Sequence, residues 1–197
     1  MTGPAPCAAR PRTISRKSDK SPEQRNIRTE VRIMTTGASL SALQQALEFE
    51  KNGKQYYTEA AAKAQDPATQ ALFNMLVEEE QNHLNYLLNL YEYLKANDKW
   101  PEKITIKLDK DFDQIFAKAR EQIDTNIKVS TDQMEAMRHA VDMENKGKAM
   151  YLDLAAKAQD PLERELFELL ADWEKGHAAY CEDYYNFYTD HGMFTED

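Results

Sequence analysis

The chain has 197 residues, of which 42% are hydrophobic and 30% are charged, and its net charge is −9. These values exclude a wholly disordered chain, and no apolar run approaches the roughly 18 residues that a membrane span needs. Six glycines and seven prolines provide too few turns for a sheet of many short strands, so we expect a mostly helical body.

Residues 1–38 differ from the rest of the chain. They hold eight Lys or Arg against three Asp or Glu, a local charge of +5, and they lack apolar periodicity. We expect a basic, disordered N-terminal extension, either a non-native start ahead of Met34 or a targeting or docking tail. Residues 39–197 carry the remaining charge of −14, which argues against nucleic-acid binding.

A helix hairpin is predicted in residues 39–95. Apolar residues recur at intervals of three and four on both sides of Asp66-Pro67, where Asp suits an N-cap and Pro suits the first helical position. Because the link between the helices is only a few residues long, the helices must lie antiparallel.

Residues 96–130 form a connection that is too long for a tight turn. Even partly coiled, this segment can run the length of a 27-residue helix, about 40 Å. A second hairpin follows in residues 131–190, around Asp160-Pro161. The predicted fold is therefore all-α, a four-helix bundle of two antiparallel hairpins joined by one long crossover. A short extra helix in the crossover is predicted from Phe112, Ile115, Phe116, Ala119 and Ile123.

The two hairpins are duplicates of one unit. A shift of 94 positions aligns residues 45–87 with residues 139–181 without a gap, and 18 of the 43 pairs are identical. Chance alone would give roughly three identical pairs, so the repeat indicates a duplicated structural element.

Six polar residues interrupt the apolar seams at positions that match between the repeats. At 1.5 Å per residue, all six lie about 21–26 Å from the turn of their own hairpin, so they can meet at one level of the bundle. Isolated buried charges cost several kcal/mol each, so this core needs compensation. The six residues are Glu50, Glu80, His83, Glu144, Glu174 and His177.

Four carboxylates and two neutral imidazoles suit two divalent cations, because formal charges of −4 and +4 cancel. Mixed oxygen and nitrogen ligation favours iron or manganese, and zinc can take their place. A Glu-x-x-His sequence points two side chains of one helix at the same spot, although a single copy is weak evidence. Two copies, each with a seam Glu 30 residues upstream, are a strong signal.

This ligand set resembles that of the ferritin-like di-iron carboxylate proteins. Among them, residues 39–190 are most similar to rubrerythrins. The resemblance implies a ferritin-like bundle with two Fe, in which Glu80 or Glu174 bridges the ions. Glu50, Glu144 and both histidines would then each bind one ion.

Tyr57 and Tyr151 also match the rubrerythrin pattern. Each tyrosine follows a helix Glu by seven residues, and in rubrerythrins such tyrosines hydrogen-bond ligand carboxylates. We therefore expect both to support the site, rather than to be plain core aromatics or radical sites.

The resemblance implies an enzyme of oxidative-stress defence, which reduces hydrogen peroxide or O₂. Two cysteines cannot make a disulfide framework, so we expect a cytoplasmic protein, and we also expect a homodimer or larger homo-oligomer. The sequence holds two cysteines and no C-x-x-C, so it contains no rubredoxin domain, and an external donor such as a rubredoxin would supply electrons. Gly147 stands where rubrerythrins have an additional Glu, which leaves a six-ligand set closer to bacterioferritin-like sites. The alternative function is therefore a ferroxidase that oxidises Fe²⁺ for mineral storage.

Two metal-free alternatives stay open, a polar network in the core and a helical interaction module.

Other residues are assigned by position. Cys181 aligns with Leu87 and is expected to be a buried core thiol, whereas His139 and His191 are expected at the surface. Three acidic residues beside the site are expected on a solvated helix face, with delivery of Fe²⁺ to the site as the alternative role: Glu78, Glu79 and Asp172.

Overall fold

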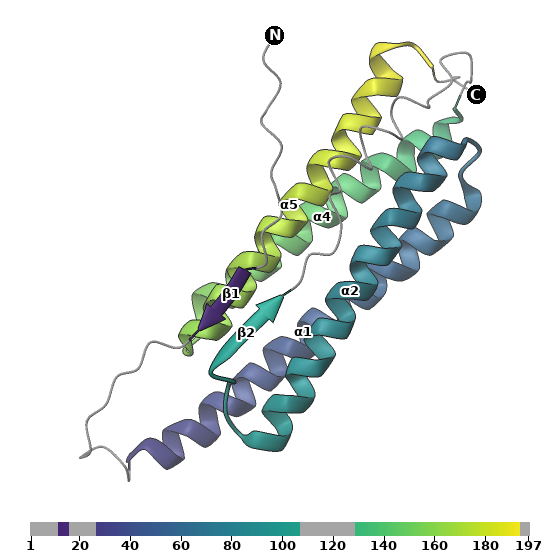
Figure 1. Cartoon of the computed structure of the whole chain (residues 1–197). Coiled ribbons are helices and arrows are strands. Elements are labelled where there is room, and N and C mark those ends of the chain that lie inside the picture. The colour runs from purple at the N-terminus through teal and green to yellow at the C-terminus, as the bar shows by residue number, and fades with distance from the viewer. Residues whose placement is uncertain (1–11, 16–26, 107–128, 194–197) are drawn as a thin grey trace.

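Four long helices dominate the computed structural model, which describes residues 12–15, 27–106 and 129–193. The helices are α1 (Ile27–Lys63), α2 (Pro67–Asn97), α4 (Thr131–Lys157) and α5 (Pro161–Asp190). Helix α1 packs along α2 and α4 packs along α5, and the two hairpins join into one bundle (Figure 1). The predicted all-α four-helix bundle of two antiparallel hairpins is confirmed.

Both hairpin turns use the predicted Asp-Pro pair. Asp66 is the N-cap of α2 and accepts hydrogen bonds from the backbone N–H groups of Ala68 and Thr69, each at 3.0 Å. Asp160 is the N-cap of α5 and accepts from the Leu162 N–H at 2.9 Å. The proline that follows each aspartate occupies the first turn, where a missing N–H costs nothing. The local chemistry of the two turns is therefore the same.

Asp66 also ties the first hairpin to the second. Its carboxylate accepts a hydrogen bond from the Tyr188 hydroxyl at 2.9 Å and another from the Gln133 side-chain amide. Tyr188 lies near the end of α5 and Gln133 near the start of α4. The α1–α2 turn is thereby fixed against the opposite hairpin at one end of the bundle.

Asp66→Ala is expected to lower the free energy of unfolding by about 2–3 kcal/mol. The lost cap accounts for about 1 kcal/mol, and the lost buried hydrogen bonds to the other hairpin account for the rest. Urea denaturation measures the change. Asp160→Ala, at the equivalent cap, is the control and should cost less than Asp66→Ala. Equal losses in the two variants would contradict the cross-hairpin role of Asp66.

The structure adds a short β-ribbon that the sequence pattern did not predict. Strand β1 (Arg12–Ser15) pairs antiparallel with β2 (Lys103–Ile106), with Arg12 opposite Ile106. Two four-residue strands with a single alternation each give no periodicity that separates them from loop. The predicted helix around Phe112–Ile123 lies outside the described residues.

The N-terminal segment also differs from the expected disordered extension. Within residues 1–38, the structure places residues 12–15 in β1 and begins α1 at Ile27. After Pro22 no proline interrupts the sequence before Pro67, so nothing in the backbone stops the helix at residue 39. The domain boundary after residue 38 stays a prediction.

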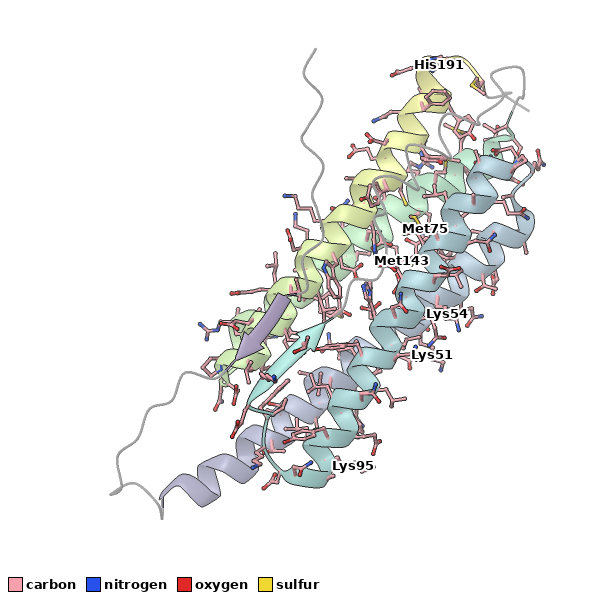
Figure 2. The ribbon with its side chains drawn as sticks, in the orientation of Figure 1. Lys51, Lys54, Met75, Lys95, Met143 and His191 are labelled. Carbon is pink, nitrogen blue, oxygen red and sulfur yellow. The ribbon has the colours of Figure 1, made fainter. Side chains whose placement is uncertain are left out.

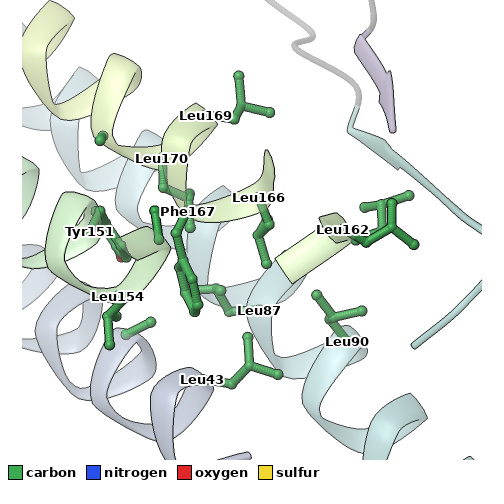
Figure 3. Packing of buried hydrophobic residues seen from close by; sticks show 14 of the residues in the cluster. Leu43, Leu87, Leu90, Tyr151, Leu154, Leu162, Leu166, Phe167, Leu169 and Leu170 are labelled. Atoms are coloured by element: carbon green, nitrogen blue, oxygen red, sulfur yellow. The ribbon is translucent and has the colours of Figure 1, made fainter. Parts of the chain in front are cut away.

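The apolar core lies in two parts, one toward each end of the bundle, and the polar level lies between them. In the part nearer the α4–α5 turn, Leu43, Leu87, Tyr151 and Phe167 are fully buried and gather between the helices (Figure 3). Each such side chain contributes about 1.5–3 kcal/mol through burial. In the described part of the chain, no helix is both long and apolar enough to cross a membrane.

Candidate metal centre

The structure brings all six predicted ligand residues together between the four helices. Each is buried, with His177 the most exposed at 6%. Two groups have ligand-type atoms that all lie within 4.8 Å of one another. The first is Glu50, Glu80 and His83, and the second is Glu80, Glu144, Glu174 and His177. Glu80 belongs to both groups and so lies where the two groups meet.

The distances give each half of the site an imidazole beside a carboxylate. Nδ1 of His83 lies 3.0 Å from Glu50 Oε2, 3.8 Å from Glu80 Oε2 and 4.0 Å from Glu174 Oε1. Nδ1 of His177 lies 3.4 Å from Glu144 Oε2. The duplicated Glu-x-x-His sequences thus place one imidazole beside the carboxylates of each half of the site.

Tyr57 and Tyr151 cross between the hairpins. The Tyr57 hydroxyl donates a hydrogen bond to Glu144 Oε1, and the Tyr151 hydroxyl donates one to Glu50 Oε1. The expected tyrosine–carboxylate bonds are therefore present, and each reaches the carboxylate of the opposite repeat. Tyr57 stacks on Phe73 at 6.0 Å and Tyr151 on its counterpart Phe167 at 6.1 Å, so packing holds both rings in place.

The four carboxylates divide into two electrostatic classes. Burial acts to raise the pKa of Glu50, but the adjacent His83 and the Tyr151 hydrogen bond outweigh it and hold the pKa at about 2. Burial is likewise outweighed at Glu144, where His177 and Tyr57 lower the pKa. These two carboxylates are therefore ionised over the physiological pH range.

Glu80 and Glu174, the central pair of carboxylates, have pKa values shifted in the opposite direction. Burial, followed by the charge of Glu50, raises the pKa of Glu80 well above its ordinary value. Burial and the charge of Glu144 do the same for Glu174. Four carboxylates in one buried space cannot all ionise without added positive charge, so protons occupy the central pair where cations do not.

The pKa values of the two tyrosines and of His177 are also shifted by the buried site. Burial, together with the neighbouring carboxylates, raises the pKa of Tyr57 and of Tyr151, so both hydroxyls stay protonated and act as donors. At His177, burial acts to lower the pKa, but the charge of Glu144 outweighs it and the net shift is upward.

Unsatisfied polar atoms show that the donor set fits a pair of cations. Six buried side-chain atoms of the site have no hydrogen-bond partner, although orphaned buried polar groups are rare in folded proteins. The six atoms are Glu80 Oε2, His83 Nε2, Glu144 Oε2, Glu174 Oε1, Glu174 Oε2 and His177 Nδ1. The four carboxylate oxygens and His177 Nδ1 are lone-pair donors of the kind that bind iron or manganese, whereas His83 turns its other nitrogen, Nδ1, toward the carboxylates.

Basic side chains do not compensate the buried acids. Among the described residues, no lysine or arginine forms an ion pair with the four site carboxylates. Lys54, which lies one helical turn after Glu50, points outward from α1 (Figure 2) and donates to Gln81 Oε1 at 2.6 Å. No lysine or arginine of the described residues therefore supplies the positive charge that a metal-free network of these four acids would need.

Two glycines allow the central carboxylates to approach the neighbouring helices. A Cβ at Gly53 would lie 3.0 Å from Glu80 Oε1. A Cβ at the matching position, Gly147, would lie 2.8 Å from Glu174 Oε2 and 2.6 Å from the ring of Phe49. Real Cβ atoms do not come this close, so a side chain at residue 147 would displace its neighbours.

Most of the remaining positional predictions are confirmed. Cys181 is fully buried, and burial raises the pKa of its thiol, which makes it an inert core residue. His139 and His191 are exposed, as are Glu78 and Asp172.

The expectation for Glu79 is wrong, because its side chain is buried, with 5% of its surface exposed. One ligand-type atom of Glu79 lies within 4.8 Å of ligand-type atoms of His83 and His177. The sequence held a signal for this position, since Glu79 lies three residues after Leu76 and four before His83, both of which are buried.

Comparison with known families gives one match. A family model described as Rubrerythrin matches residues 41–185, a range that contains both hairpins and all six site residues. No curated protein and no solved structure matches the chain.

Proposed function

Because the chain belongs to the rubrerythrin family of ferritin-like di-iron proteins, we propose that it is an oxidoreductase that reduces hydrogen peroxide, or O₂, at a pair of iron ions. The observation that carries this proposal is the cluster of five unpartnered, buried ligand atoms, four carboxylate oxygens and His177 Nδ1, at the level where the two repeats meet. Metal-free alternatives leave those atoms unexplained. The location in the cytoplasm and the homo-oligomeric state stay predictions.

The proposed ligand set follows the two halves of the site. Glu50 and His83 would hold one ion, and their counterparts Glu144 and His177 the other. Glu80 and Glu174 would be shared between the ions, which is supported by the membership of Glu80 in both groups of ligand atoms and by the 4.0 Å between Glu174 and the opposite-hairpin His83. Manganese or zinc suits the same donors.

When bound, a pair of Fe²⁺ ions supplies the two electrons that, with two protons, convert one hydrogen peroxide into two waters. The chain's own residues prepare the site for this chemistry. Tyr57 and Tyr151 stay protonated and hold Glu144 and Glu50 from the opposite hairpin, so each outer carboxylate is oriented by a donor on the facing helix. Repeated turnover would require a separate electron donor, which stays a prediction.

The central carboxylates would exchange protons for cations. Their raised pKa values keep Glu80 and Glu174 protonated in the metal-free protein, so loading must release protons. The buried apolar residues on both sides of the site exclude bulk water, which strengthens the electrostatic interactions inside it.

A ferroxidase is the second candidate, and one observation favours it. Position 147 lacks the carboxylate that rubrerythrins commonly place there, and the space above Gly147 is filled by Phe49 and Glu174. The site therefore offers a symmetric set of six ligands. Such a set would suit oxidation of Fe²⁺ on its way to a mineral store.

Rapid mixing distinguishes the two functions. Protein loaded anaerobically with two equivalents of Fe²⁺ is mixed in parallel with stoichiometric hydrogen peroxide and with air-saturated buffer, and iron oxidation is followed by absorbance. We expect peroxide to oxidise the iron faster than O₂ does. A Glu80→Ala variant treated in the same way gives the rate for iron that is not held as a pair. Oxidation by peroxide no faster than by air would contradict the peroxidase assignment, and iron uptake far beyond two per chain would establish the ferroxidase.

A further inference from the structure

Glu79 is a buried carboxylate that breaks the symmetry of the repeat. The shift of 94 residues that aligns the two hairpins places Trp173 at the equivalent position. Glu79 Oε1 accepts a hydrogen bond from Asn82 Nδ2 at 3.1 Å. A carboxylate that is 95% buried needs further donors, since one amide hydrogen bond does not replace its lost hydration.

The two site imidazoles lie beside Glu79. Ligand-type atoms of Glu79, His83 and His177 all lie within 4.8 Å of one another. The two imidazole rings stack at 5.5 Å with 17° between their planes, and His83 also stacks on Trp173 at 4.9 Å. Stacking fixes the plane of the His83 ring, so only the nitrogens on its edge are left for polar contacts.

The two nitrogens of His83 have different surroundings. Nδ1 faces the site carboxylates, with Glu50 Oε2 at 3.0 Å. Nε2 is buried and has no hydrogen-bond partner. A histidine that binds a metal through one nitrogen almost always donates its other N–H to a carboxylate, a carbonyl or water. Glu79 is a buried carboxylate outside the proposed ligand set, and one of its oxygens lies within 4.8 Å of a ring nitrogen of His83 and of a ring nitrogen of His177.

We propose that Glu79 is a positioning residue, which accepts hydrogen bonds from the outer ring nitrogens of both His83 and His177 and so orients the two imidazoles toward the cations. One carboxylate serves both halves of the site because its counterpart is Trp173. The inference rests on the proposed metal centre and adds to it. Use of Glu79 in a third cation site is disfavoured, because His83 would then have to bridge two ions through both of its nitrogens.

The test uses Zn²⁺, which is diamagnetic, with the full chain labelled with ¹⁵N at histidine. Zn²⁺ affinity is measured by competition with a chelator, and the ring N–H signals are recorded by NMR on protein loaded with two equivalents. Glu79→Leu removes the acceptor, Glu79→Gln keeps an uncharged acceptor of the same shape, and Glu78→Leu removes the exposed carboxylate next in sequence as a control. Circular dichroism confirms that each variant folds.

In the parent protein we expect the ring N–H signals of His83 and His177 to lie downfield and to exchange slowly with solvent. Glu79→Leu should abolish that protection and weaken Zn²⁺ binding by about 10- to 100-fold. Glu79→Gln should restore the slow exchange and part of the affinity, whereas Glu78→Leu should change affinity by no more than about twofold.

Three outcomes would overturn the inference. In the first, Glu79→Leu leaves both the ring signals and the affinity unchanged while two Zn²⁺ still bind, and the metal centre then stands without this role for Glu79. In the second, a third Zn²⁺ per chain binds only when Glu79 is present, which assigns Glu79 as a ligand. In the third, the parent protein binds no Zn²⁺, Mn²⁺ or Fe²⁺ at all, and the proposed function fails together with the inference.

Discussion

Glu80→Ala and Glu174→Ala are each expected to abolish paired-metal binding, so that the protein holds at most one of the two cations that the parent binds. The two carboxylates lie at the centre of the site, and Glu80 reaches the ligand atoms of both halves. Removing either carboxylate takes away an oxygen that the two ions would share, so only one ion is still held. The charge of a single cation would then have to balance both ionised outer carboxylates, Glu50 and Glu144. Anaerobic loading with Fe²⁺, followed by elemental analysis after desalting, measures the stoichiometry.

The fold should survive these substitutions. In the metal-free protein the central carboxyl groups are protonated and three of their four oxygens have no hydrogen-bond partner, so they contribute little to stability. Helicity should therefore stay close to that of the parent. Glu174→Gln, which preserves volume, separates loss of a ligand from loss of packing, and Glu168→Ala removes an exposed carboxylate of the same helix as a control. Retention of two irons by both alanine variants would contradict the ligand assignment.

The stability of the metal-free protein is expected to fall as pH rises from about 5 to 8. The pKa values of Glu80 and Glu174 are raised above their ordinary value of 4.5, so above that pH the native state keeps protons that the unfolded chain has lost. Each such proton lowers the free energy of unfolding by about 1.4 kcal/mol per pH unit. His177 acts in the same direction, because its raised pKa stabilises the fold at low pH and that contribution is lost as pH rises.

The outer carboxylates act in the opposite direction, but in a lower pH range. The pKa of Glu50 is lowered to about 2, so its stabilising contribution is full above pH 4.5 and is lost only as pH falls toward 2. Glu144 is shifted in the same direction. The metal-free protein should therefore be most stable near pH 5.

Bound cations should reverse this trend between pH 5 and 8. Two cations replace the protons of the central pair, and their affinity increases with pH because binding releases protons. At a free metal concentration 100-fold above the dissociation constant, binding adds about 2.7 kcal/mol per site. Urea denaturation at several pH values measures how the free energy of unfolding depends on pH, once with chelator and once with Mn²⁺. Glu174→Gln should make this dependence weaker in the metal-free protein. A metal-free stability that rises from pH 5 to 8 would contradict the protonation of the central pair.

Most of the fold could be predicted because its signals are local in the chain. Helix periodicity and the Asp66-Pro67 and Asp160-Pro161 caps depend on residues a few positions apart, and the repeat shows that both hairpins obey the same pattern. The β-ribbon was missed because two strands of four residues pair over a distance of some 90 residues, a contact that leaves no local period.

The six site residues were predictable for a related reason, since a charged side chain in an apolar seam is visible without knowledge of the partner helix. The sequence by itself therefore determined that two duplicated hairpins place four carboxylates and two imidazoles at one level. Only the tertiary structure decided that Tyr57 and Tyr151 hold the carboxylates of the opposite hairpin, and that Glu79 is buried beside both imidazoles while its neighbour Glu78 faces solvent. Those contacts depend on how far each helix is rotated against its neighbours, and that rotation is set by packing across the whole bundle rather than by spacing along any one helix.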